Sequence, residues 1–179
     1  MNVRVILALK KQQKTNNQSE LIMPEIEKIP LLLKVSDFHP RFEEAVALVS
    51  DSLEANELNF RTASVVLDEP DIVDFWGHVP EPILFCLLEK LAGQTLFSWL
   101  VQGENTVDRV NRLKGEDTDP KKCGQSTLRS QLTAMLGYRK VSLCKSDYTF
   151  EYIAIENYIH SPSAKELAVH MKFFEPYFQ

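Results

Sequence analysis

Short apolar runs alternate along the 179-residue chain with longer segments whose apolar residues recur every three or four positions. The runs at 3–9 and 94–101 are almost continuously apolar, which is typical of strands buried on both faces. Residues 60–67 alternate between apolar and polar side chains instead, which is the pattern of a half-buried strand. The longer segments have the spacing of helices that pack on a sheet. This order predicts an α+β domain.

The segments with helical spacing are expected at 41–56, 83–93, 103–115, 126–132 and 164–174. The last of these follows Ser163 and Glu166, which have the spacing of a capping box. Residues 150–156 add a strand-like run, and residues 29–33 are open to interpretation as an extra strand. The whole pattern favours a split βαβ sandwich of the ferredoxin-like kind, in which helices cover one main face of an antiparallel sheet.

Charge and cysteine content exclude several classes of partner. The formal net charge of -5 argues against a general nucleic-acid surface, because such surfaces need a basic excess. The three cysteines lack metal-type spacing, which favours a reducing compartment and a cytoplasmic location. The N-terminal apolar run is too short to span a membrane. We therefore expect neither nucleic acid nor a membrane as a partner.

Polar side chains that could hold a polyphosphate lie at the ends of predicted elements and in the loops between them. They are Lys10, Arg112, Thr118, Arg129 and His160. Arginine binds phosphate oxygens with two donors, lysine supplies a point charge, and threonine adds a neutral donor. A neutral imidazole is available around neutral pH and can act as a nucleophile. Each basic residue taken singly is equally compatible with a solvated surface charge.

Three stretches of the chain resemble nucleoside diphosphate kinases. Residues 103–132 are similar to the family segment in which an arginine-bearing helix is followed by Gly, a Thr-Asp-Pro loop and a Thr-Leu-Arg turn. Asn-Tyr-Ile-His at 157–160 is similar to the start of the family's histidine signature, and VILALK at 5–10 resembles its first strand, which ends in a lysine. With the helix and strand at 41–67, the resemblance covers most of the chain.

The resemblance implies one domain over residues 1–179, with insertions near 11–39 and 131–150. It implies that His160 takes the γ-phosphate of a nucleoside triphosphate and passes it to a diphosphate, with Mg²⁺ bridging the β- and γ-phosphates. The implied ligands of the nucleotide are Arg112, Thr118 and Arg129 for the phosphates, Lys10 for the transferred group, and Asn157 for the ribose or a neighbouring phosphate.

Supporting positions differ from the family pattern. Ser161 replaces the glycine that follows the histidine, and Pro162 stands where Ser or Asp is usual, which reduces the side-chain room next to His160 and leaves Ser161 and Ser163 as supporting hydroxyls in altered positions. The family's tyrosine beside the histidine corresponds to Phe75 or Trp76. The family's base-stacking phenylalanine falls near Ile83 or Leu84, and Glu166 is a candidate partner for the His160 ring.

Two function classes follow from these motifs. The first is a nucleoside diphosphate kinase-like enzyme, and the second is a catalytically silent module of the same fold in a homo-oligomer or a larger assembly, such as the ciliary assemblies that contain divergent family members. Fold resemblance alone does not separate them. The remaining histidines, His39, His78 and His170, have no partner at metal-ligand spacing and are expected to be structural or surface residues.

Overall fold

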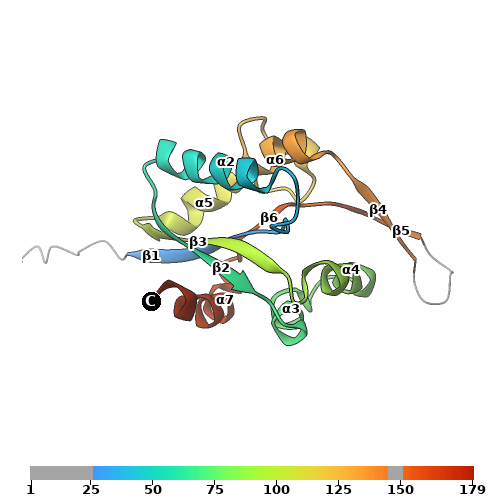
Figure 1. Ribbon diagram of the computed structural model, residues 1–179. Helices are drawn as coiled ribbons and strands as arrows, with labels where there is room; N and C mark the ends of the chain where they lie inside the picture. Colours follow the sequence, from blue (N-terminus) through green and yellow to red (C-terminus); the bar gives the residue numbers. More distant parts are fainter. Residues whose placement is uncertain (1–25, 145–150) are drawn as a thin grey trace, which may run out of the picture.

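The computed structural model describes residues 26–144 and 151–179, and the helices and strands of that part form two helical layers around one sheet (Figure 1). The predicted strand at 3–9 and the predicted phosphate ligand Lys10 lie outside the described residues.

The main sheet has four strands in the order β2-β3-β1-β6, and all neighbouring strands are antiparallel. The strands are β1 (Glu27–Leu33), β2 (Asn59–Val66), β3 (Thr95–Gly103) and the two-residue β6 (Ile159–His160). The apolar run at 29–33, which the sequence left open as an extra strand, is part of β1 and pairs on both sides. The range 11–39 that was expected as an insertion therefore contains a central strand of the sheet.

Helices cover both faces of the sheet, whereas the sequence pattern suggested mainly one (Figure 1). Over one face lie α2 (Phe42–Ala55), α5 (Thr106–Lys114) and α6 (Leu128–Leu136). Over the other lie α3 (Glu69–Trp76), α4 (Glu81–Leu91) and α7 (Leu167–Phe174), followed by the 3₁₀ turn η2 (Glu175–Phe178). A second 3₁₀ turn, η1 (Pro120–Lys122), precedes α6.

The first core layer lies between the sheet and α2, α5 and α6. It includes Leu53, Trp99, Val110 and Leu132, all fully buried. The indole Nε1 of Trp99 donates to the Ser50 hydroxyl of α2 at 3.0 Å, so the one polar atom of this large side chain is satisfied. The spacing of apolar residues along α2 thus has its expected role of attaching the helix to the sheet.

The second core layer is rich in aromatic rings. Phe75 of α3, Phe174 of α7 and Phe178 of η2 pack there against Leu96 of β3. The Phe75 and Phe174 rings are stacked at 5.8 Å. The phenylalanines of the C-terminus are therefore core packing.

A separate two-stranded sheet is formed by β4 (Lys140–Cys144) and β5 (Glu151–Ile155), which extends from the body beyond α4 (Figure 1). β4 lies within the range 131–150 expected as an insertion, and β5 lies just beyond it. None of the helices in the described ranges combines the length and the apolar character that a membrane crossing requires.

Replacing Leu53 with alanine should test the first core layer. Leu53 is fully buried under the sheet, so its truncation should lower the free energy of unfolding by about 2–5 kcal/mol. The matched control is Phe38→Ala, because Phe38 is 87% exposed and its loss should change stability by less than about 0.5 kcal/mol. Urea unfolding measures both, and similar losses in the two variants would contradict this packing.

Candidate functional site

His160 ends β6 and lies at the edge of the main sheet. Antiparallel pairing places it opposite Leu32 of β1. The side-chain oxygen of Asn157 accepts a hydrogen bond from the backbone N–H of Ile159 at 3.2 Å, which fixes the start of the short strand. Asn157 therefore stabilises the segment that leads into His160.

The His160 ring packs on an aromatic surface made by α3 and α7. The Trp76 ring meets it edge to face at 4.9 Å, and the His170 ring lies at 5.2 Å. Nε2 of His160 is buried without a hydrogen-bond partner among the described residues. Burial, followed by the positive charge of Lys34, holds the pKa of His160 well below its usual value, so the ring is neutral at physiological pH.

Lys34 follows β1 directly and shares the sheet face of His160. Its backbone N–H donates to the Tyr158 carbonyl at 2.7 Å, which continues the pairing of β1 with β6 beyond the strand ends. Its ammonium lies 5.9 Å from the centre of the Trp76 ring, in the range of a cation–π contact. Burial, with a further contribution from Arg129, lowers the pKa of Lys34 to about 8.

Lys114, the last residue of α5, approaches from the other side of β6. Its side chain is 7% exposed, and its ammonium donates to the Ser161 hydroxyl at 2.6 Å and to the Asn111 side chain at 2.8 Å. The Ser161 hydroxyl in turn donates to Asn111 at 3.0 Å. Burial, together with the charge of Arg129, lowers the pKa of Lys114 to about 8.

Arg129 of α6 binds the loop that precedes its helix. Its guanidinium donates to the carbonyls of Gly115 and Asp117 at 2.7 and 2.5 Å, while its Nε is buried without a partner in the described part of the chain. Burial lowers the pKa of Arg129. The backbone carbonyls orient the guanidinium without neutralising its charge.

The positive charges of Lys34, Lys114 and Arg129 all act on His160 and lower its pKa, and these three residues are called the cation cluster. Across residues 26–144 and 151–179, none of the three forms an ion pair. Three acidic residues influence the cluster: Glu156, which pairs with Lys90 at 2.8 Å, Glu166, which contacts His78 at 3.3 Å, and Asp117, whose charge acts on Arg129. A cation cluster in which no member has an ion-pair partner is suited to an anion.

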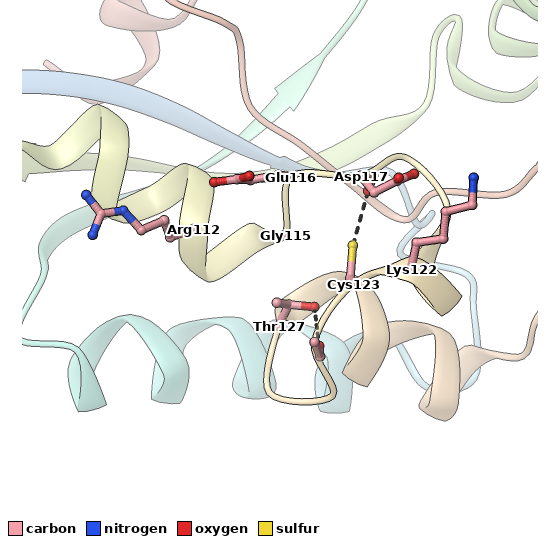
Figure 2. Close-up of a pocket in the computed structure, with 8 residues that line it drawn as sticks. Arg112, Gly115, Glu116, Asp117, Lys122, Cys123 and Thr127 are labelled. Atoms are coloured by element: carbon pink, nitrogen blue, oxygen red, sulfur yellow. Dashed lines mark hydrogen bonds between the residues drawn. The ribbon is translucent and has the colours of Figure 1, made fainter.

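Two further predicted phosphate ligands have no hydrogen bond to His160 within the described ranges. Arg112 and Thr118 are exposed, and no hydrogen bond joins either to His160 in the described residues. Arg112 instead lines a surface pocket of about 530 Å³ between α5 and the loop before α6. Figure 2 shows Arg112 and Lys122 at opposite ends of this pocket, with Cys123 and Thr127 between them.

The supporting residues also differ in position from what was expected. Glu166 does not contact His160: its carboxylate accepts the backbone N–H of Ser163 at 2.8 Å, which is half of the predicted capping box, and its other oxygen faces His78. Phe75 stacks on His170 at 4.0 Å, so the aromatic neighbour of His160 is Trp76.

Three residues of the site were missed by the sequence analysis. Lys34 follows an apolar run, as Lys10 does. The sequence does not show that the run before Lys34 pairs with the strand that carries His160. Lys114 lies two residues after Arg112, where a lysine at a helix end is ordinarily a solvated charge. His170 had no partner at a recognisable spacing, so only its position in space reveals it.

Comparison with solved structures identifies the fold. A nucleoside diphosphate kinase from Aquifex aeolicus matches 84% of this chain and 95% of its own, with a TM-score of 0.60 and 15% identity. A Borrelia burgdorferi nucleoside diphosphate kinase, a transition-state mimic with bound vanadate and ADP, matches 83% of this chain and 86% of its own, with a TM-score of 0.60 and 17% identity. One from Halobacterium salinarum, in complex with CDP, has a TM-score of 0.57, with 14% identity over 84% of this chain and 88% of that one.

These matches confirm that the chain has the nucleoside diphosphate kinase fold, as the motifs predicted. No protein-family model matches the sequence, and no curated protein matches it significantly. At this level of identity the likeness establishes architecture, and the chemistry depends on the residues around His160.

Gly115 should be sensitive to substitution because it shapes the loop that Arg129 binds. Its φ is +101°, and an added Cβ would lie 2.9 Å from the Cys123 sulfur. Gly137 has a nearly equal φ of +102° with nothing within 4 Å of its added Cβ, so it is the matched control for backbone strain alone. Gly115→Ala should therefore cost about 1 kcal/mol more than Gly137→Ala in urea unfolding. Equal losses would contradict the close contact.

The lowered pKa values of Lys34 and Lys114 should make stability depend on pH. Their pKa values are about 8 in the folded protein, against 10.5 for an unperturbed lysine, so the unfolded chain binds more protons between these values. The free energy of unfolding should therefore rise with pH through this window, by on the order of 1 kcal/mol. Urea unfolding at about pH 8 and about pH 10 measures the slope. The double variant Lys34→Met, Lys114→Met should flatten it, and a flat wild-type profile would contradict the lowered pKa values.

Proposed function

We propose that this protein is a phosphotransferase that moves the γ-phosphate of a nucleoside triphosphate to a nucleoside diphosphate through phosphorylated His160. The observation that carries the proposal is the surroundings of His160: a neutral imidazole with a buried Nε2, on which the charges of Lys34, Lys114 and Arg129 act, and no ion-pair partner for any of the three cations in the described residues.

The reaction needs a histidine that is unprotonated on one nitrogen. That nitrogen attacks the γ-phosphorus, an N–P bond forms, the bond from the γ-phosphorus to its bridging oxygen breaks, and the nucleoside diphosphate leaves. A second diphosphate attacks the phosphohistidine and reverses these steps. The low pKa of His160 keeps its lone pair available over the physiological pH range.

The cation cluster would stabilise the negative charge of the transferred phosphoryl group. Phosphoryl transfer involves little covalent chemistry by the protein, so that positioning and electrostatic stabilisation supply most of the rate. Lys34 shares the sheet face of His160, and Lys114 and Arg129 approach from α5 and α6. Cations in a partly dehydrated site act more strongly on phosphate oxygens than they would in water.

The nucleotide would bring its own magnesium. No group of three His, Cys, Asp or Glu in the described ranges could hold a metal ion by itself, so Mg²⁺ would be bound through the substrate phosphates. Phe85 of α4 is 58% exposed, which leaves its ring available for stacking on a base. This residue is one position beyond the Ile83 and Leu84 suggested by the sequence.

A catalytically silent module of the same fold is the second candidate. It is favoured by the positions of Arg112 and Thr118, which are exposed and have no hydrogen bond to His160 in the described part. It is also favoured by Ser161, whose hydroxyl is engaged by Lys114 and Asn111. In that case the cation cluster would bind an anion without transferring it.

Incubation with magnesium and γ-labelled ATP tests the two candidates. Wild-type protein should acquire acid-labile label and lose it when a nucleoside diphosphate is added. His160→Ala should acquire none, because the nucleophile is gone. Lys34→Met should be labelled at least about 100-fold more slowly, because a positive charge that acts on the transferred phosphoryl group is lost. His39→Ala is the control, since His39 lies before α2 and outside the site.

The outcomes separate the candidates clearly. Label on the wild type that is discharged to the diphosphate would establish the transferase. Binding of ATP without label in wild-type protein at high ATP concentration would reject the transferase and support the silent module.

A further inference from the structure

His170 is a buried polar side chain that the proposed chemistry has not yet used. It lies on α7, is 1% exposed, and has no hydrogen-bond partner on either ring nitrogen in the described residues. His160 has one such nitrogen, Nε2. An unpaired buried polar atom destabilises the folded state, so three of them in adjacent rings require an explanation.

The two rings are at the separation of a hydrogen-bonded pair. A hydrogen bond of about 2.9 Å between two imidazole nitrogens places the ring centres about 5 Å apart. The His160 and His170 centres are 5.2 Å apart, with their planes inclined by 33°. Rotation of either ring about its Cβ–Cγ bond changes which nitrogen faces the neighbour while the ring centre hardly moves. One N–H···N hydrogen bond therefore fits the observed spacing.

The packing around His170 fixes the plane of its ring. Phe75 stacks on it at 4.0 Å and 19°, and the ring of Phe174 lies parallel within 19° at 6.4 Å. The ring can turn over within its plane but cannot tilt away from His160. The plane of the ring beside His160 is thus fixed.

Behind His170 a carboxylate leads to the surface. Glu166 stands one turn earlier on the chain, and its charge acts on His170 against the effect of burial, which lowers the pKa of His170 to about 4. Glu166 also contacts His78, whose side chain is 59% exposed, at 3.3 Å. The cations Lys34, Lys114 and Arg129 act on His160, and the charge of Glu166 acts on His170 and on Lys114.

We propose that His170 is a positioning residue for His160: it accepts the ring N–H of His160, fixes the tautomer of that ring, and thereby directs the lone pair of the other nitrogen toward the phosphate site. The proposal rests on the proposed function for the identity of the group that His160 attacks. The hydrogen-bonded histidine pair itself is a property of the unligated protein and can be measured without any reaction.

The proton balance supports this arrangement. When one nitrogen of His160 bonds to phosphorus, the other still carries a proton and the ring gains positive charge. The hydrogen bond to His170 holds that proton on His160, and the Glu166 carboxylate, whose charge acts on His170, adds a negative charge near the pair. When a diphosphate removes the phosphoryl group, the His160 ring becomes neutral again and keeps that proton. No outside base is needed.

The test is the tautomer of His160 in ¹⁵N-labelled protein, read from long-range ¹H–¹⁵N correlation spectra. The chain has four histidines, so each can be assigned by its loss in a single variant. Wild-type His160 should show one tautomer. In His170→Phe, which keeps a stacked ring beside Phe75 but no nitrogen, both tautomers should be populated, and in His170→Asn the amide oxygen should restore one. His39→Phe is the control and should leave His160 unchanged.

Activity gives a second, separate measurement. His170→Phe should acquire label from ATP about 100-fold more slowly than wild type, with ADP affinity unchanged, and His170→Asn should recover part of the rate. A folded His170→Phe protein with unchanged His160 spectra would overturn the proposal. If His170→Phe does not fold, unchanged His160 spectra in His170→Leu would equally overturn the proposal. Absence of label in wild type would reject the transferase alone, because the spectra still decide the histidine pair.

Discussion

The antiparallel pairing of β1 with β3 and β6 is the constraint on which the rest of the structure depends. On one side, the register of Leu31 with Trp99 connects β1 to the core under α2. On the other, the register of Leu32 with His160 brings the C-terminal part of the chain to the edge of the same sheet. A two-residue strand such as β6 has too few hydrogen bonds to set its own position, so the site inherits its geometry from β1.

Alternation of side chains along the paired strands then divides the site between the two faces. Leu32, Lys34 and His160 share the face covered by α3 and α7, where Trp76 contacts both polar residues. Ser161 follows His160 and turns to the opposite side, where it meets Lys114 of α5. A shift in register by one residue would exchange these faces and separate Lys34 from His160. The cation cluster is thus a consequence of strand parity as much as of residue type.

The sequence predicted the fold class well because the helix and strand periods are strong and the motifs from Arg112 to Arg129 and from Asn157 to His160 are local. It could not decide between two apolar runs that each end in a lysine, since pattern alone does not say which run finds partners in a sheet. The pairing of β1 makes Lys34 the lysine beside the histidine. His170 escaped for a related reason: a single histidine on an amphipathic helix carries no signal until the helix is docked.

The substitutions around His160 form a connected set. Ser161 stands where the resembled family has glycine, and it is 4% exposed. Its hydroxyl forms hydrogen bonds with Lys114 and Asn111, which connect the end of β6 to α5. Lys114 in turn adds a cation to the surroundings of His160. On the other side of the His160 ring, the uncharged rings of Trp76 and His170 pack against it and exclude water. The positive charge of the cation cluster favours the deprotonated form of His160, and a bound anion would offset that charge. Protonation of the site is therefore coupled to the binding of an anion.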